Sequence, residues 1–265
     1  MKHLNSLILG NTDRHLIVLH GFLGMGNNWK THAKHWADLG WCVHLIDQRN
    51  HGKSFWSSEF DYSIMAEDMK VYLDHKSIEK CTVLGHSMGG KTAMTFAIQY
   101  PERVKQLIIA DIGPKSYPSH HQQILNGLAS LDFSKLKTRG SVNQALMHYV
   151  PEVEVRQFLM KNLYWVEKRV LGLRINIEVL KQVGEKIGLG LEPNQKYNGS
   201  VLFLRGLQSD YIIDGDQLTL KHHFPNYTLK DIKKAGHWLH AENPVAFLGA
   251  IESWWAQIIF FTLTL

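Results

Sequence analysis

The sequence predicts an α/β protein with a mostly parallel, doubly wound sheet and helices on both faces. Short apolar runs recur along the chain, and each is continuous rather than alternating, as in strands buried on both faces. Helix-like segments lie between them, and strand followed by helix, repeated, is typical of a doubly wound sheet. The runs are "LIVL" (16–19), "CVHLI" (42–46), "CTVL" (81–84), "LIIA" (107–110) and "VLFL" (201–204).

Local patterns predict the other elements. Residues 5–10 are expected to form the first strand, whereas residues 227–232 alternate and suit an edge strand. Residues 61–75 are expected to form a helix that Ser63 caps. The apolar positions of this helix fall on one face, and they are Met65, Met69, Tyr72 and Leu73.

One long interval interrupts the alternation of strands and helices. From about Pro114 to Gly199 the chain offers helix-like pieces and no good strand, and roughly 85 residues are too many for one loop. We therefore expect a small helical cap at 114–199, inserted between strands 6 and 7 of the sheet. Residues 1–113 and 200–265 would form the core domain.

Composition and charge exclude several classes of function. The 265 residues carry a net charge of +5, but Lys and Arg are scattered and no nucleic-acid motif is present, so no nucleic-acid partner is expected. No stretch approaches the ~20 apolar residues that span a bilayer, so stable membrane insertion is not expected. Each of the two cysteines opens an apolar run, which favours a reducing, cytoplasmic compartment. The apolar residues 254–265 suit a last packed helix or a homodimer contact.

A serine flanked by glycines is the strongest functional signal. Ser87 lies between Gly85 and Gly89, after an apolar run and before a helix-like segment. In this setting G-x-S-x-G is typical of a nucleophile elbow, a strained turn in which small neighbours avoid a clash. The turn presents the hydroxyl at the carboxyl end of the sheet, where open α/β sheets bind ligands. It also places the N–H of Met88 at a helix N-terminus, where it can stabilise an oxyanion.

A serine hydroxyl needs a base, and the base needs an orienting acid. Among 16 histidines, His237 follows the last expected strand and is therefore the expected base, with His240 as a neighbour. Asp210 and Asp111 each follow a buried strand at the carboxyl edge, so both are candidates for the acid. The chain order Ser, Asp, His favours Asp210, with Asp111 as the alternative.

A second turn supplies the other oxyanion donor. In "HGFLG" (20–24) the backbone N–H of Phe22 can point at the same oxyanion as that of Met88, and each such donor lowers the barrier by about 3 kcal/mol. The residues expected to line the substrate site are Leu23, His86 and two aromatic residues of the cap, Tyr164 and Trp165.

These motifs together resemble the α/β-hydrolase fold family, and most of all its YbfF-type bacterial esterases. The resemblance spans the chain through "HGFLG", "DQRNHGKS" (47–54), "GHSMGG", "DIGP" (111–114), "GLQSDY" (206–211) and "GHWLHAENP" (236–244). It implies a small helical cap and cleavage of acyl esters and thioesters without metal or cofactor. It also implies that Asp47, Arg49 and Gly52 brace a loop. Most of the wider family takes its acid from the position that matches Asp210, and some YbfF-like members use the position that matches Asp111. The resemblance therefore does not choose between the two residues.

The expected activity is hydrolysis of a small-molecule carboxylic ester, or of a thioester such as an acyl-CoA, through an acyl-enzyme. Dehalogenases and epoxide hydrolases of the same fold need a carboxylate nucleophile, and Ser87 argues against both. A C–C bond hydrolase, a cofactor-free perhydrolase and a non-catalytic ligand receptor remain as alternatives. The sequence does not name the natural acyl group.

Overall fold

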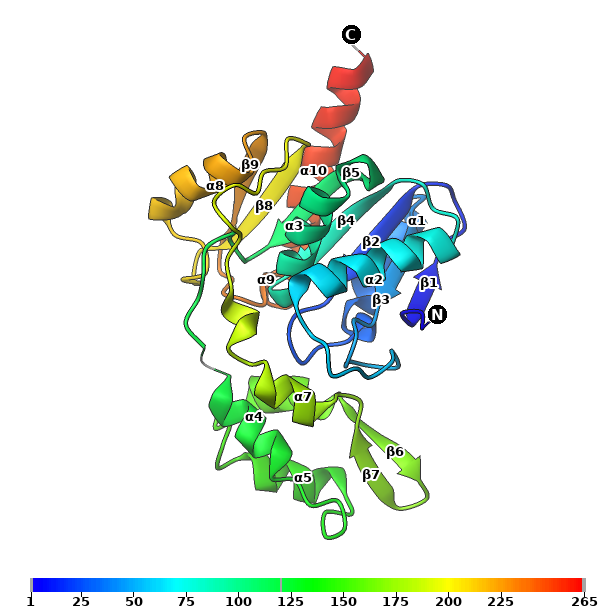
Figure 1. The fold of residues 1–265 in the computed structure, drawn as a ribbon, viewed down its shortest axis with the longest axis vertical. Helices are drawn as coiled ribbons and strands as arrows, with labels where there is room; N and C mark the ends of the chain where they lie inside the picture. Colours follow the sequence, from blue (N-terminus) through cyan, green and yellow to red (C-terminus); the bar gives the residue numbers. More distant parts are fainter. Residues whose placement is uncertain (1, 120, 264–265) are drawn as a thin grey trace.

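A computed structural model describes residues 2–119 and 121–263. Within these residues, seven strands form one sheet in the order β1-β3-β2-β4-β5-β8-β9 (Figure 1). Neighbouring strands run parallel except for β1, which pairs antiparallel with β3. The strands are β1 (Ser6–Leu9), β2 (His15–Leu19), β3 (Cys42–Ile46), β4 (Cys81–His86), β5 (Val104–Ala110), β8 (Val201–Gly206) and β9 (Tyr227–Ile232).

Helices cover both faces of this sheet, as the sequence predicts. Alternate residues of each strand point to opposite faces, so Ile17 packs in the layer of α2 and α3 while Leu16 packs in the layer of α1 and α10. The helices of the core are α1 (Lys30–Asp38), α2 (Tyr62–His75), α3 (Met88–Gln99), α8 (Gln217–His223), α9 (Leu239–Glu242) and α10 (Pro244–Leu263). Short 3₁₀ turns are η1 (Gly26–Trp29), η2 (Pro101–Arg103) and η4 (Asp214–Asp216).

The local predictions for the core are largely confirmed. Every expected strand is present, and the alternating segment 227–232 is indeed an edge strand, β9. Helix α2 buries the predicted apolar face. Its N-cap is Asp61 rather than Ser63, because the Asp61 carboxylate accepts a hydrogen bond from the N–H of Ile64 at 2.8 Å.

The segment between β5 and β8 lies beyond the carboxyl ends of the strands (Figure 1). The sequence analysis expected the insertion between strands 6 and 7 of the sheet. In chain order the two flanking strands, β5 and β8, are the fifth and sixth strands of the sheet that the structure describes. The expectation of no strand in this segment was also wrong, since β6 and β7 pair as an antiparallel hairpin. The segment comprises α4 (Gln122–Ala129), α5 (Arg139–Leu146), α6 (Val153–Met160), β6 (Leu163–Glu167), β7 (Val170–Leu173), α7 (Ile177–Gln182) and η3 (Lys186–Gly188).

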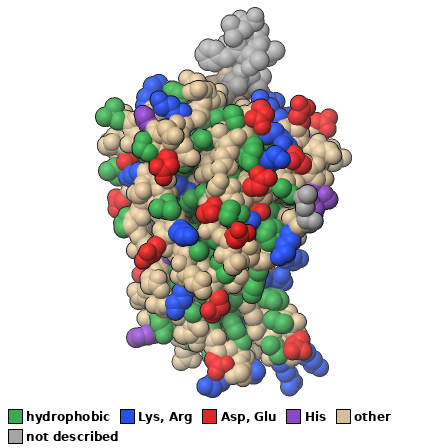
Figure 2. Space-filling view, viewed as in Figure 1, with side chains coloured by type: hydrophobic (Ala, Val, Ile, Leu, Met, Phe, Trp, Pro, Cys, Tyr) green, Lys and Arg blue, Asp and Glu red, His purple; other side chains and the backbone are tan. Residues whose placement is uncertain are grey.

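The last helix, α10, packs through its first half. Trp254 and Trp255 are buried, and Trp255 lies against Trp36 and Trp41. Residues 264–265 lie outside the described residues, so the homodimer contact expected of 254–265 stays a prediction. A search of the described residues finds no helix whose length and apolar character would suffice to cross a membrane. Figure 2 shows acidic and basic side chains interspersed over the viewed face.

Candidate active site

Ser87 occupies the sharp turn between β4 and α3. Its backbone φ is 54° and its ψ is −119°, a region that non-glycine residues rarely adopt. A Cβ on Gly85 would collide with the backbone of Gly89, and a Cβ on Gly89 would collide with the carbonyl oxygen of Leu19. The glycines are therefore required by close backbone approach, and the turn holds the Ser87 hydroxyl beyond the end of β4.

His237 joins Ser87 to a buried acid. Its Nε2 lies 2.9 Å from Ser87 Oγ, and its Nδ1 lies 2.9 Å from Asp111 Oδ2. Asp111 directly follows β5 and is fully buried, whereas the His237 side chain is 25% exposed. A carboxylate only accepts hydrogen bonds, so Nδ1 carries the proton and Nε2 presents its lone pair to the serine hydroxyl.

The carboxylate of Asp111 is held by several donors besides His237. The Gly206 N–H donates to its Oδ1 at 2.9 Å, and the Ser209 hydroxyl donates to its Oδ2. The ring of Tyr211 stacks on the imidazole of His237 with ring centres 3.9 Å apart. These contacts fix both the acid and the plane of the imidazole before any substrate arrives.

The structure places Asp111, and not the preferred Asp210, beside the imidazole of His237. Asp210 is exposed, in a bend that follows β8. Its two chain neighbours face inward instead: Ser209 contacts Asp111, and Tyr211 contacts His237. The physical reason is the tight turn in which the Ser209 N–H donates to the Gly206 carbonyl at 3.0 Å, which turns Ser209 toward the site. Ser209 and Tyr211 are thus site residues that the sequence analysis missed, one position on either side of the expected one.

The turn after β2 lies against Ser87. A Cβ on Gly21 would come within 2.9 Å of His86 Nδ1 and 3.3 Å of the Ser87 Cβ. The ring of His20 locks this turn, because its Nε2 accepts from the Gln48 N–H at 3.1 Å and its Nδ1 donates to the Gly21 carbonyl at 2.8 Å. Burial lowers the pKa of His20, which keeps the ring neutral as these two bonds require. The N–H of the next residue, Phe22, therefore belongs to a rigid turn.

Met88 is the first residue of α3, and its N–H belongs to the first turn, whose N–H groups have no acceptor within the helix. Phe22 and Met88 thus belong to the two turns that meet at Ser87, and their role as oxyanion donors stays a prediction.

His86 supports the loop that carries His237. Its Nε2 lies 2.8 Å from the backbone carbonyl of His237. Burial, with a smaller effect of the neighbouring His237, lowers the pKa of His86 to about 3, so the ring is neutral and Nε2–H donates to that carbonyl. His86 also lines the cavity, and its bond to the His237 carbonyl helps to position the loop of the base.

A cavity of about 890 Å³ opens in front of Ser87 and His237. The core contributes Phe22, Leu23 and Trp29 to its walls, and Trp29 stacks on His240 with ring centres 4.1 Å apart. Helices α4 and α6 close it from the other side through Ile124, Phe158 and Leu159. The lining is mainly apolar with the catalytic-type groups at one wall, as in many sites for small organic molecules.

Two expected cavity residues lie elsewhere. Tyr164 and Trp165 belong to β6, and neither is among the described residues that line the cavity. The Trp165 side chain is 55% exposed, and the Tyr164 ring lies 4.4 Å from the guanidinium of Arg174. The hairpin directs them away from the site, whereas Phe158, on the preceding helix, lines the cavity.

The loop after β3 is braced as the resemblance implied. The Asp47 carboxylate accepts from the N–H groups of Gly26 and Lys53 at 2.8 and 2.9 Å. A Cβ on Gly52 would collide with that carboxylate, which explains the glycine with its φ of 59°. Arg49 forms two hydrogen bonds to Asp68 on α2.

Lys91 lies one turn after Ser87 on α3 and is buried, with 1% of its surface exposed. Its Nζ donates to the backbone carbonyl of Lys115 at 2.5 Å and lies 5.1 Å from the centre of the Tyr117 ring. Burial, and to a smaller extent the charge of Lys115, lowers the pKa of Lys91 to about 7. A buried amine with this pKa makes the stability of the protein depend on pH.

Lys91→Met is expected to raise the free energy of unfolding at pH 7, with a gain that shrinks toward pH 10. Between the folded pKa of about 7 and the ordinary value of 10.5, the unfolded chain binds more protons at this position than the folded chain does. Wild-type stability therefore rises with pH across this window, by at most ~1.4 kcal/mol per pH unit from this group. Urea unfolding of both proteins at pH 7, 8.5 and 10 measures the difference, and a difference independent of pH would contradict the assignment.

Comparisons with known proteins agree with this geometry. The alpha/beta hydrolase fold family matches residues 14–244. The chain is 36% identical over 244 residues to the sn-1-specific diacylglycerol lipase ABHD11 of Danio rerio, covering 89% of this chain and 76% of that protein. It is 31% identical over 238 residues to Esterase YbfF of Escherichia coli, covering 89% of this chain and 91% of that protein.

A solved structure titled "Marine microorganism esterase" is also similar, with a TM-score of 0.92 and 37% identity over 96% of this chain and 99% of that one. The family match covers the elbow, the turn after β2 and the loop of His237, and the relatives named above are esterases and lipases. The chain therefore belongs to the α/β-hydrolase fold family.

Proposed function

We propose that the protein is a carboxylic ester hydrolase that uses Ser87, His237 and Asp111 through an acyl-enzyme. The observation that carries this proposal is the unbroken chain of contacts from Ser87 Oγ through the imidazole of His237 to the buried Asp111 carboxylate, at the wall of an apolar cavity. The esterase and lipase names of the relatives support the same class of reaction.

In the acylation step, Ser87 Oγ attacks the ester carbonyl and His237 Nε2 takes the hydroxyl proton. The carbonyl oxygen becomes an oxyanion between the N–H groups of Phe22 and Met88. Asp111 stabilises the imidazolium and holds its Nδ1 proton. Nε2–H then protonates the leaving alcohol, or the leaving thiol of a thioester, and the C–O or C–S bond breaks.

In the deacylation step, a water molecule attacks the acyl-enzyme while His237 Nε2 removes its proton. The same two N–H groups stabilise the second oxyanion. Collapse of this intermediate returns the proton to Ser87 Oγ and releases the carboxylic acid. No residue changes its net charge over the cycle.

The cavity supports an ester with an apolar acyl or alcohol part. Its size and its apolar walls favour chains longer than acetate, since each buried methylene adds about 0.8 kcal/mol of binding. We also propose that residues 114–199 act as a lid over a core of residues 1–113 and 200–265, because α4 and α6 close the cavity. The buried free thiols of Cys42 and Cys81 support the prediction of a cytoplasmic location.

Hydrolysis of p-nitrophenyl esters from C2 to C16, together with fluorophosphonate labelling, tests this function. We expect turnover of at least the middle of the series and one covalent adduct, located on Ser87 by peptide mass spectrometry. A receptor would label without turnover. A C–C bond hydrolase would cleave an acyl ketone faster than any ester, and a perhydrolase would need peroxide for its best rate. Any of these three results would overturn the proposal.

Phe158→Ala is expected to shift the preference toward longer acyl chains. Phe158 lies on α6 at the cavity wall, with its ring 5.8 Å from that of Trp238. Removing the ring makes room for about two methylenes, so the ratio of kcat/KM for C12 over C4 should rise roughly tenfold. Trp165→Ala is the matched control, because that aromatic residue lies in the same segment but outside the cavity. An unchanged ratio in Phe158→Ala, or an equal shift in Trp165→Ala, would contradict the assigned wall.

A further inference from the structure

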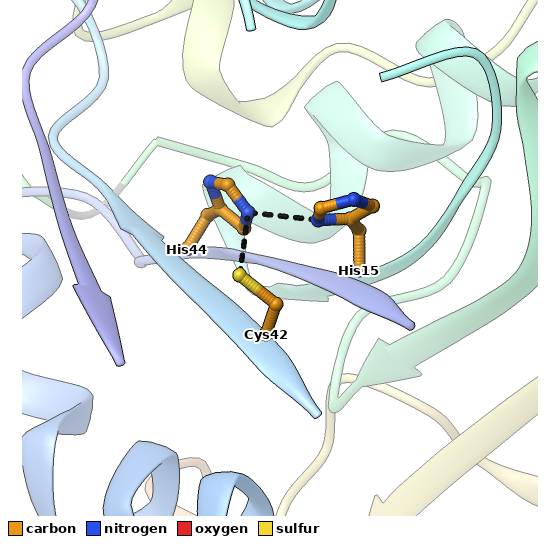
Figure 3. Close-up of side chains that lie close together, drawn as sticks. All are labelled: His15, Cys42 and His44. Atoms are coloured by element: carbon orange, nitrogen blue, oxygen red, sulfur yellow. Dashed lines mark hydrogen bonds between the residues drawn. The ribbon is translucent and has the colours of Figure 1, made fainter. Parts of the chain in front are cut away.

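Three side chains of types that can bind a metal ion meet toward the amino ends of β2 and β3 (Figure 3). Ser87 lies at the other end of the sheet, beyond the carboxyl end of β4. The register pairs His15 with Cys42 across the two parallel strands, and His44 follows Cys42 by two residues. Residues two apart on a strand share a face, so all three side chains emerge on one face of the sheet. That face is otherwise apolar, and it also carries Ile17 and Ile46.

Two of the three donor-atom separations are close to those around a tetrahedral ion. His15 Nδ1 lies 3.1 Å from His44 Nε2, and Cys42 Sγ lies 3.4 Å from the same nitrogen. All three atoms lie within 4.8 Å of one another. Zinc binds nitrogen at ~2.0–2.1 Å and sulfur at ~2.3 Å, which separates neighbouring ligand atoms by roughly 3.3–3.6 Å in a tetrahedral site. The two separations from His44 Nε2 lie within a few tenths of an ångström of these values, and the third, from His15 Nδ1 to Cys42 Sγ, is at most 4.8 Å and would shorten around an ion.

A second layer of contacts orients the central ligand. His44 Nδ1 lies 2.8 Å from the hydroxyl of Tyr72 on α2, and that hydroxyl donates to Ser6 Oγ at 2.8 Å. The Tyr72 oxygen therefore accepts from His44 Nδ1–H, which leaves the lone pair of Nε2 directed at His15 and Cys42. Such a partner on the far nitrogen is typical of metal-binding histidines, because it fixes the tautomer and the ring plane.

We propose that His15 Nδ1, Cys42 Sγ and His44 Nε2 form a binding site for a Zn²⁺ ion, separate from the reaction at Ser87. One thiolate and two imidazoles are a ligand set that suits zinc. Binding releases the proton of the Cys42 thiol, and the proton on His15 Nδ1 moves to its Nε2 so that both imidazoles bind through lone pairs. The ion would link β2 to β3 and, through Tyr72, to α2. It would thereby stabilise β2, the strand that leads into the turn of Phe22.

The two cysteines of the chain offer a matched pair of variants. Cys81 is buried like Cys42, but it opens β4 and its Sγ contacts the carbonyl of Arg103. Chelator-treated, full-length protein would be titrated with Zn²⁺ by calorimetry and with Co²⁺ by absorption spectroscopy. We expect one equivalent of Zn²⁺ and a thiolate-to-cobalt charge-transfer band in wild type and in Cys81→Ser. Cys42→Ser should lose the band and bind Zn²⁺ on the order of 100-fold more weakly.

Tyr72→Phe separates a metal site from a simple hydrogen-bond network. It removes a contact to His44 but no ligand atom, so the cobalt band should persist while the affinity falls about 10- to 100-fold. If Cys42→Ser does not fold, as judged by near-UV circular dichroism, His15→Ala carries the test, since His15 is only half-buried at the start of β2. It should weaken Zn²⁺ binding on the same order. Absence of Zn²⁺ binding by wild type, or a Cys42-independent band, would overturn the proposal.

Discussion

Asp111→Asn is expected to lower kcat for ester hydrolysis by about 10⁴-fold, while Asp210→Asn stays within about twofold of wild type. The amide has nearly the shape of the carboxylate, so the contact to His237 at 2.9 Å can persist. However, the amide NH₂ can donate to Nδ1, which moves the imidazole proton to Nε2. A protonated Nε2 cannot accept the proton of Ser87, and the imidazolium loses its counter-charge. Asp210 is exposed, and its replacement changes neither the position of the imidazole proton nor the counter-charge of the imidazolium.

Both variants would be compared by steady-state hydrolysis of one p-nitrophenyl ester, with each rate divided by the concentration of correctly folded protein. This correction matters because Asp111 also accepts a hydrogen bond from the N–H of Gly206, so its replacement can lower the stability of the protein as well as the rate of hydrolysis. Fluorophosphonate labelling of Ser87 should slow in Asp111→Asn by a similar factor, since labelling needs the same base. Collapse of Asp210→Asn with an active Asp111→Asn would reverse the assignment.

The sequence alone predicts those parts of the site that lie in a single turn or loop. The glycines around Ser87 identify the elbow because the backbone itself leaves no room for a side chain. His237 was predictable because it follows the last strand of a sheet whose carboxyl edge holds the site. Both inferences rest on a short motif at the carboxyl end of one strand, and sequence patterns carry most information over such short stretches.

The choice of acid could not be made in the same way. Both Asp111 and Asp210 follow strands that end at the same edge, and a difference of one residue in the turn after β8 decides which side chain faces inward. The turn and bend at 207–211 put Ser209 and Tyr211 in the site and Asp210 in solvent. Turn geometry at this precision is set by tertiary contacts such as that between Gly206 and Asp111.

The segment 114–199 was the least predictable part for a related reason. The residues of β6 and β7 carry enough apolar character to suit a helix or a hairpin, so their pattern alone does not predict the pairing of Tyr164 with Gly172. Because the hairpin was not predicted, Tyr164 and Trp165 were wrongly expected to line the cavity. Phe158 was missed because its role depends on how α6 lies over the core.

Ser87→Ala is expected to lower kcat by about 10⁶-fold while leaving the fold and substrate binding nearly intact. The substitution removes the atom that attacks the ester, and neither Phe22 nor Met88 loses its N–H. The residual rate should still exceed that in water by roughly 10³-fold, because oxyanion stabilisation and binding persist without the nucleophile.

Three measurements on Ser87→Ala check this expectation. Turnover should fall to that residual rate and fluorophosphonate labelling should disappear, whereas the affinity for a non-hydrolysable ester analogue should stay within a few-fold of wild type. Ser63→Ala serves as the control for loss of a hydroxyl, because Ser63 is exposed on α2 and contacts Gln99. Turnover by Ser87→Ala at the wild-type rate would mean that the ester carbon is attacked by another group, most directly a water activated by His237. In that case the strained turn at Ser87 would serve to place the oxyanion donors rather than a nucleophile.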